Sequence, residues 1–278
     1  MQDRSRRDRF SPSKGDARSI ERAGALVRGK LMHRRIYVAV AVLLFVMTFA
    51  FRNSQKVQAQ TCHQTTTHGG QVTYSSMASI DLYLMDREAE IDLARSAAPE
   101  AISRNATVLV LGRHGYETAA TGANGFVCLV ERAWMSPFNS PDFWHPKIRG
   151  PLCLNPKAAR SILPIDYKKT ELALAGHSKE QISEWTKTAY ANKELPAVEP
   201  GAMSFMMSKR ASLDSEGRNM AHLMFYTPFM EGAEWGADLP NSPVLLGDQG
   251  PPGSYDLFVI PVGKWADGTS APLPGNRE

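Results

Sequence analysis

The chain has 278 residues, of which 43% are hydrophobic and 22% charged, with 18 prolines, 21 glycines and 3 cysteines. These values exclude a collagen, a coiled coil, a wholly disordered chain and a multispan membrane protein, because each of these classes has a very different composition. The formal net charge is +4, but residues 1–59 hold 13 of the 32 lysines and arginines and 4 of the 28 acidic residues. The rest of the chain therefore has a net charge of −5. We expect no nucleic-acid partner, since neutralising phosphates requires clustered basic residues.

The N-terminal segment has the features of an export signal. Residues 36–51 form an apolar run of 16 residues without a charge, directly after Arg34 and Arg35. As a helix the run would be about 24 Å long, which is shorter than a hydrocarbon core of about 30 Å. With small residues before a cut after Ala59, the pattern predicts a signal peptide. The alternative is an uncleaved anchor in the inner membrane, which would be the chain's membrane contact. Both interpretations place the rest of the chain in the periplasm or outside the cell.

The leader is longer than export requires, and a signal peptide that starts at Met32 would be compact. Met32 is therefore an alternative start of translation. We divide the chain into a leader (1–59), a flexible polar tether (60–77), one globular domain (78–268) and a loose tail (269–278). Cys62 in the tether has no lipidation motif before it and is expected to be a free or intermolecular thiol.

The domain begins with helical periodicity over residues 80–98, which Pro99 ends. Strands are then predicted at 107–111, 116–119 and 126–132. The dipeptide Asn124-Gly125 before the third strand is typical of a hairpin, so we expect an antiparallel meander.

Residues 134–153 contain four prolines and four aromatic residues with no regular period, which predicts a long irregular loop. Cys128 and Cys153 enclose this loop. In an oxidising compartment they would form a disulfide that stabilises the fold by about 3.5 kcal/mol through loop closure.

The second half of the domain predicts helices followed by strands. Asn155-Pro156 starts one helix, and Ser178 to Gln181 is a capping box that opens another helix to about residue 192. Strands are predicted at 202–208, 222–227 and 256–262, the last ending or lying at a sheet edge because of Pro261. Strands with helices grouped between them indicate an α+β fold with an antiparallel sheet in one domain.

Residues 122–132 (GANGFVCLVER), the aromatic loop that ends at Cys153, and the later GAMSFMMS and HLMFYTP together resemble a family of uncharacterised exported bacterial proteins. The resemblance extends over residues 80–268. It implies export and a single domain, and it implies no activity and no catalytic residue.

A second resemblance concerns Arg113 and His114. A predicted strand followed by Gly-Arg-His-Gly resembles the opening of the histidine phosphatase superfamily, in which the histidine attacks phosphorus and the arginine holds phosphate oxygens. The resemblance implies His114 as nucleophile and Arg113 as phosphate clamp, with His177 as a possible partner. The predicted hairpin stands where that family has a helix, and Gly112 and Gly115 suit a tight turn without any function.

A soft-metal site is another candidate. Six of the twelve methionines lie between Met203 and Met230, together with His222. On strands, Met203 and Met207 would share one face, and His222 and Met224 another, so pairing of these faces could bind Cu(I). The alternative is a core in which methionine fills irregular space and His222 is hydrogen-bonded.

Aromatic side chains in the long loop are candidates for ligand binding. Trp134, Phe143 and Trp144 could stack on a sugar or an apolar ligand, or they could anchor the loop to the core.

The leading hypothesis is a non-catalytic envelope or extracellular binding protein whose ligand contacts the loop 134–153 or the strand that bears His222. Phosphohydrolase and copper-binding activities remain alternatives, so whether the chain is an enzyme stays open. No cofactor is expected, and the ligand and oligomeric state are not indicated.

Overall fold

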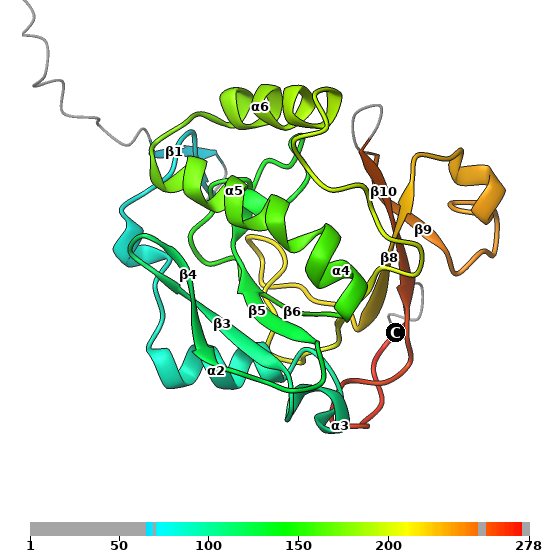
Figure 1. Ribbon diagram of the computed structural model, residues 1–278. Helices are drawn as coiled ribbons and strands as arrows, with labels where there is room; N and C mark the ends of the chain where they lie inside the picture. The colour runs from blue at the N-terminus through cyan, green and yellow to red at the C-terminus, as the bar shows by residue number, and fades with distance from the viewer. Residues whose placement is uncertain (1–64, 69–70, 250–253, 274–278) are drawn as a thin grey trace, which may run out of the picture. The chain divides into compact units, whose positions relative to one another are not determined.

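In the residues that the computed structural model describes (65–68, 71–249 and 254–273), eight strands form one mixed sheet in the order β4-β3-β5-β6-β7-β8-β10-β9 (Figure 1). The strands of the sheet are β3 (Thr107–Gly112), β4 (Gly115–Ala120), β5 (Val127–Glu131), β6 (Gly150–Leu154), β7 (Met203–Met206), β8 (His222–Pro228), β9 (Leu245–Gln249) and β10 (Tyr255–Pro261). The α-helices are α2 (Arg87–Arg95), α3 (Glu100–Ser103), α4 (Pro156–Ser161), α5 (Leu163–Leu174) and α6 (Lys179–Ala191), and three 3-10 helices are η1 (Ile80–Leu82), η2 (Ala133–Met135) and η3 (Gly232–Trp235).

Several predictions concern residues that the structure does not describe. These are the leader with residues 36–51, the alternative start at Met32, the cut after Ala59, and Cys62. Among the residues described, no helix is long and apolar enough to cross a membrane.

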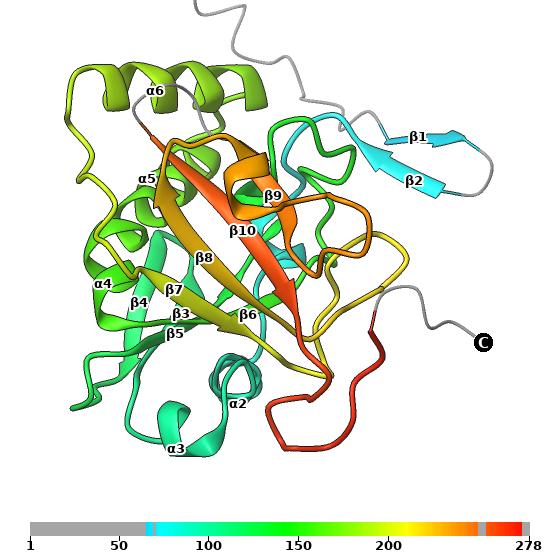
Figure 2. The same cartoon turned by 90° about the vertical axis from the view of Figure 1, so that its right-hand side faces the viewer.

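The sheet separates two helical layers, which confirms the predicted α+β class. The longer helices α5 and α6 lie with α4 on one side of the sheet, and α2 and α3 lie on the other (Figure 2). Side chains alternate between the two faces of each strand. Leu129, Leu152 and Met224 therefore pack with α4 and α5, whereas Val130 and the two cysteines pack against α2.

The predicted meander is wrong at its third strand. β3 and β4 form the expected antiparallel hairpin, but β5 pairs with the other edge of β3 and runs parallel to it. The chain crosses at Gly122, whose backbone N–H donates to Thr107 Oγ1 over 3.0 Å. A Cβ at this glycine would lie 2.2 Å from the Asn105 carbonyl oxygen. Because Gly122 has no side chain, the chain can pass close to the backbone of Asn105 and continue to the far edge of β3. The dipeptide Asn124-Gly125 lies in this connection and not in a hairpin turn.

The helix predicted over residues 80–98 is divided in two. The 3-10 helix η1 comes first, and α2 begins only at Arg87 because the Asp86 side chain accepts a 3.0 Å hydrogen bond from Ala89 N and caps it. The capping box of α6 is confirmed, with reciprocal hydrogen bonds between Ser178 and Gln181.

The proline-rich segment 134–153 is not irregular to its end, since its last residues form β6, buried along its whole length. Cys128 of β5 lies directly opposite Cys153 of β6. The predicted disulfide between them is present, and it lies in the buried cluster beneath α2.

Both ends of the domain contain structure that the sequence did not predict. Within the segment taken as a tether, Thr65–His68 (β1) and Gln71–Tyr74 (β2) form an antiparallel hairpin. At the start of the expected tail, Thr269 O accepts a hydrogen bond from Trp265 N and Ala271 N donates to Gly263 O. Strand β10 ends at Pro261, which confirms one of the two alternatives predicted for this proline. The other alternative, an edge strand, is wrong because β10 lies between β8 and β9.

A buried ion pair connects α2 with the end of β5. Arg132 Nη2 lies 2.9 Å from Glu90 Oε1, and these side chains are 0% and 1% exposed. Arg132 Nε also donates to Tyr83 O, and Leu111 N donates to Glu90 Oε1. The two charges thus hold η1, α2, β3 and β5 together.

We predict that Glu90→Gln lowers the free energy of unfolding by about 3–5 kcal/mol, because it leaves the Arg132 charge buried without its counter-charge. Chemical denaturation measures the change. The control is Glu117→Gln, which removes an exposed pair with Arg87 and should have little effect. Equal effects of the two substitutions would contradict the structural role of the buried pair.

Candidate functional site

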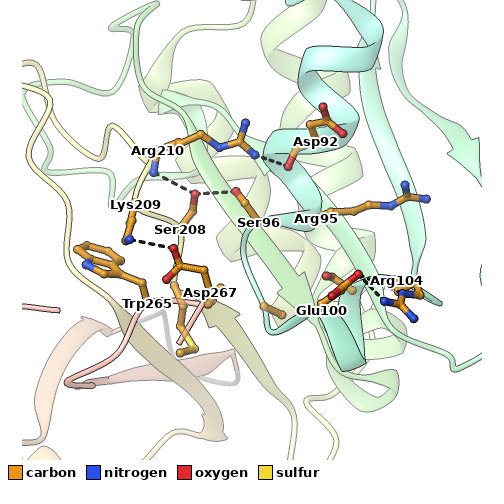
Figure 3. A pocket seen from close by; sticks show the side chains of 14 residues that line it. Asp92, Arg95, Ser96, Glu100, Arg104, Ser208, Lys209, Arg210, Trp265 and Asp267 are labelled. Atoms are coloured by element: carbon orange, nitrogen blue, oxygen red, sulfur yellow. Dashed lines mark hydrogen bonds and ion pairs between the residues drawn. The ribbon is translucent and has the colours of Figure 1, made fainter. Parts of the chain in front are cut away.

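A cavity of about 490 Å³ lies on the α2 side of the sheet, where three regions of the chain that are distant in sequence meet. Its walls come from the C-terminal end of α2 with Ser96, from α3, from residues 207–210 after β7, and from residues 265–267 after β10 (Figure 3). The size is within the range of small-molecule sites in proteins, about 300–1,000 Å³.

Main-chain hydrogen bonds hold these segments in place. Met207 N donates to Ala97 O over 2.9 Å, and Ala266 N donates to Met207 O over 2.9 Å. The hydroxyl groups of Ser96 and Ser208 lie 2.6 Å apart and face each other across the site (Figure 3). The cavity therefore depends on backbone contacts between α2, the segment after β7 and the segment after β10.

Most charged groups around the cavity have partners within it. Lys209 Nζ lies 2.8 Å from Asp267 Oδ2, and this contact together with hydrogen bonds from Thr269 lowers the pKa of Asp267 to about 2. Arg104 and Glu100 form an ion pair at 2.5 Å across one turn. These paired groups fix the rim of the cavity.

Arg95 differs from the other cationic residues of the cavity. It is the last residue of α2, a position where a positive charge is favoured by the helix dipole. Its Nε is buried and has no hydrogen-bond partner. Figure 3 accordingly shows no interaction of Arg95 with the other residues drawn.

The phosphatase candidates lie elsewhere. Arg113 and His114 form the two-residue turn between β3 and β4, where Gly112 pairs with Gly115, and both side chains are exposed. Arg113 binds Asp81 in an exposed ion pair at 2.5 Å. His177 is exposed just before α6. None of these three residues is among those that line the cavity.

The aromatic candidates belong to the core. Trp134, Phe143 and Trp144 are 0%, 1% and 3% exposed and pack in one buried cluster. Trp134 Nε1 donates a 3.1 Å hydrogen bond to Thr170 Oγ1 of α5. These rings therefore anchor the long loop to the core and offer little surface to a ligand.

The soft-metal candidates are not on one face. His222 pairs with Met206 and Met224 with Ser204, whereas Met203 pairs with Phe225 on the alternate face of β7. His222 is buried, its Nδ1 lies 2.8 Å from Met220 O, and burial lowers its pKa. Met207 lies beyond the end of β7 and lines the cavity instead. In the part of the chain that the structure describes, no three His, Cys, Asp or Glu residues are placed to hold a metal ion.

A pair of carboxyl groups on the other side of the sheet was not found from the sequence. Glu131, at the end of β5, lies close enough to Asp166 of α5 to raise the pKa of Asp166, after the larger effect of burial. Burial also raises the pKa of Glu131 to about 7, against an opposing effect of Lys169. Asp166 Oδ2 is buried and has no hydrogen-bond partner. The pair belongs to the packing of α5 on the sheet and does not line the cavity.

Comparisons with protein-family models, curated proteins and solved structures find no match to this chain.

The pKa of Glu131 predicts a pH dependence of stability. A carboxyl group whose pKa is raised from 4.5 to about 7 binds its proton more tightly in the folded protein. Stability from this group is therefore complete below about pH 4.5 and declines as the pH rises to about 7. The expected loss is on the order of 3 kcal/mol, since the pKa rises from 4.5 to about 7 and each pH unit corresponds to about 1.4 kcal/mol.

Glu131→Gln should remove the contribution of Glu131 to this decline, while burial of Asp166 preserves the remainder. Denaturation at a series of pH values measures the difference. Glu171→Gln, at an exposed carboxylate on α5, is the matched control and should keep the wild-type profile. A wild-type profile in Glu131→Gln would show that another group causes the decline, or that there is none.

Proposed function

We propose that this chain is an exported, non-catalytic binding protein whose small-molecule ligand occupies the cavity between α2, α3 and the segments 207–210 and 265–267. The observation that carries the proposal is the cavity itself, of about 490 Å³, which forms where regions of the chain that are distant in sequence meet. Its walls combine hydrophobic side chains with a few polar groups, the usual composition of a ligand site. Trp265, Met207 and Ala98 supply the hydrophobic part.

Export is supported by two features that are independent of each other. Residues 36–51 and the small residues up to Ala59 have the pattern of a signal peptide. The Cys128–Cys153 disulfide is of a kind that persists in oxidising compartments such as the bacterial periplasm and is rare in the cytosol. The similarity of GANGFVCLVER and the later segments to a family of exported bacterial proteins is a further reason for the proposal.

We predict that the mature protein begins at Gln60 and contains the oxidised Cys128–Cys153 pair, because the signal peptide is removed during export. Intact mass measurement on protein from fractionated cells, with and without reduction, tests both points. A chain that retains residues 36–51 in the membrane fraction would instead identify an anchor. A reduced chain found only in the cytoplasm would contradict export.

Binding in the cavity is tested by filling it. Ala266 lines the cavity and is partly exposed, so Ala266→Phe should place a ring in the ligand's space. Ligand-observed NMR against a library of small fragments should find molecules that bind the wild type and not Ala266→Phe.

The control is Ala175→Phe, at an exposed alanine after α5, which should bind the same fragments as the wild type. The proposal fails if every fragment that binds the wild type also binds Ala266→Phe with equal affinity, or if no fragment binds the wild type.

A further inference from the structure

The cavity has a charged rim and an uncharged floor. The rim consists of the six lining residues that are exposed, namely Asp92, Glu100, Arg104, Lys209, Arg210 and Asp267. The floor consists of the five lining residues that are buried, namely Ala98, Ser103, Met207, Ser208 and Trp265. Every rim residue is charged, and no floor residue is. A ligand that reaches the floor is therefore surrounded by groups without charge.

Ion pairs within the protein neutralise four of the six rim residues. Glu100 binds Arg104, and Lys209 binds Asp267. A ligand charge placed at the exposed rim would gain little, because water screens exposed ion pairs. A ligand charge placed on the floor would lose its hydration and meet no counter-charge there.

Arg95, the remaining charged residue of the lining, is turned away from this floor. Its side chain extends away from Ser208 and Trp265, and also from Lys209 and Arg210 (Figure 3). Its guanidinium therefore provides no counter-charge beside Trp265. The arrangement of charges around the cavity thus favours a ligand without charge.

The two serine hydroxyls that face each other in the cavity can accept hydrogen bonds but cannot donate them. Ser96 Oγ donates its single proton to Leu93 O over 2.6 Å. The proton between Ser96 Oγ and Ser208 Oγ, which are 2.6 Å apart, must therefore come from Ser208. Ser208 Oγ also accepts from Arg210 N over 3.1 Å. Both protons are in use, whereas each oxygen keeps one lone pair for a donor on the ligand.

The rest of the floor indicates the rest of the ligand. Trp265, Met207 and Ala98 are hydrophobic, and most of the surface that the cavity presents is apolar. Covering this surface with an apolar group removes it from water, which is favourable. A sugar matches the floor poorly, because it has several hydroxyl groups and each one without a partner would be unfavourable. An apolar body with one donor group matches both the hydrophobic side chains and the serine pair.

Resting on the proposed function, we infer that the ligand is an uncharged organic molecule whose apolar body packs on Trp265 and whose single hydroxyl or N–H group donates to the Ser96–Ser208 pair. Ser96, Ser208 and Trp265 are ligand-binding residues in this assignment. Arg210 is a positioning residue, since its main-chain N–H occupies one lone pair of Ser208.

Four compounds with one benzene ring provide matched probes, because they differ in a single substituent. Benzyl alcohol is uncharged and has a donor, benzyl methyl ether has no donor, benzoate is an anion, and benzylamine is a cation at neutral pH. We expect ligand-observed NMR titration of the full mature chain to show binding of benzyl alcohol. The ether should bind about threefold to tenfold more weakly, as loss of one hydrogen bond predicts, and both ions about tenfold or more.

Ser96→Ala tests the hydrogen bond separately from the shape of the cavity. Leu93 O keeps a partner in this variant, because the main-chain N of residue 96 also donates to it over 3.1 Å. The proton of Ser208 loses its acceptor and becomes available to the ligand. We therefore expect the preference for benzyl alcohol over benzyl methyl ether to fall toward equality. A structural defect alone would weaken both compounds equally and leave their ratio unchanged.

The control is Ser183→Ala in α6, which lies on the opposite side of the sheet (Figure 2). This variant should keep the wild-type ratio of the two affinities. Equal thermal melting temperatures confirm that the variants are folded.

The inference is overturned if benzoate, benzylamine or benzyl methyl ether binds the wild type as tightly as benzyl alcohol, or if Ser96→Ala leaves the ratio unchanged. Failure of the proposed function gives a different result. If benzyl alcohol binds the wild type and Ala266→Phe equally well, the ligand site is outside the cavity and the proposed function fails. If charged fragments bind the wild type and not Ala266→Phe, while benzyl alcohol does not bind, only the inference about the class of ligand fails.

Discussion

The buried ion pair between Glu90 and Arg132 is the constraint on which the rest of the domain depends. Both charges are removed from water, and a single one of them without the other would be strongly unfavourable. Helix α2 therefore has little freedom to slide or rotate on the sheet, because any such movement would separate the pair. The C-terminal turn of the same helix supplies Arg95 and Ser96 to the cavity. The position of the candidate site thus depends on the ion pair of Glu90, which lies five residues before Arg95 in the same helix.

Local signals in the sequence predicted those parts of the fold that local chemistry controls. The strand at Thr107–Gly112 follows from a run of β-branched and aliphatic residues, and the capping box at Ser178 and Gln181 fixes the start of α6 wherever the helix packs. The disulfide was predictable because two cysteines on either side of a long loop, Cys128 and Cys153, are expected to join in an oxidising compartment. These predictions required no knowledge of which strands are neighbours.

The candidate site required that knowledge, and for this reason it could not be predicted. Arg95, Ser208 and Asp267 are far apart in sequence and form no motif. They meet because the segment after β7 bonds to the residues that follow α2, and the segment after β10 bonds to the segment after β7. The two motifs that the sequence offered as candidate sites have structural explanations. Gly112 to Gly115 is a tight turn, and the aromatic loop fills the core. Glu131 and Asp166 were missed because nothing in the sequence shows that the end of β5 faces α5.

The hydrogen bonds from Met207 N to Ala97 O and from Ala266 N to Met207 O connect all three walls of the site. Its last wall, Trp265 to Asp267, lies far beyond residues 92–104 and 207–210 in the sequence, so the cavity is complete only after this later segment has been synthesised and folded. A chain that crosses a membrane unfolded would therefore reach the far side empty and acquire its ligand there. The ligand bound by the folded protein would then come from the compartment in which the chain folds and not from the compartment in which it is synthesised.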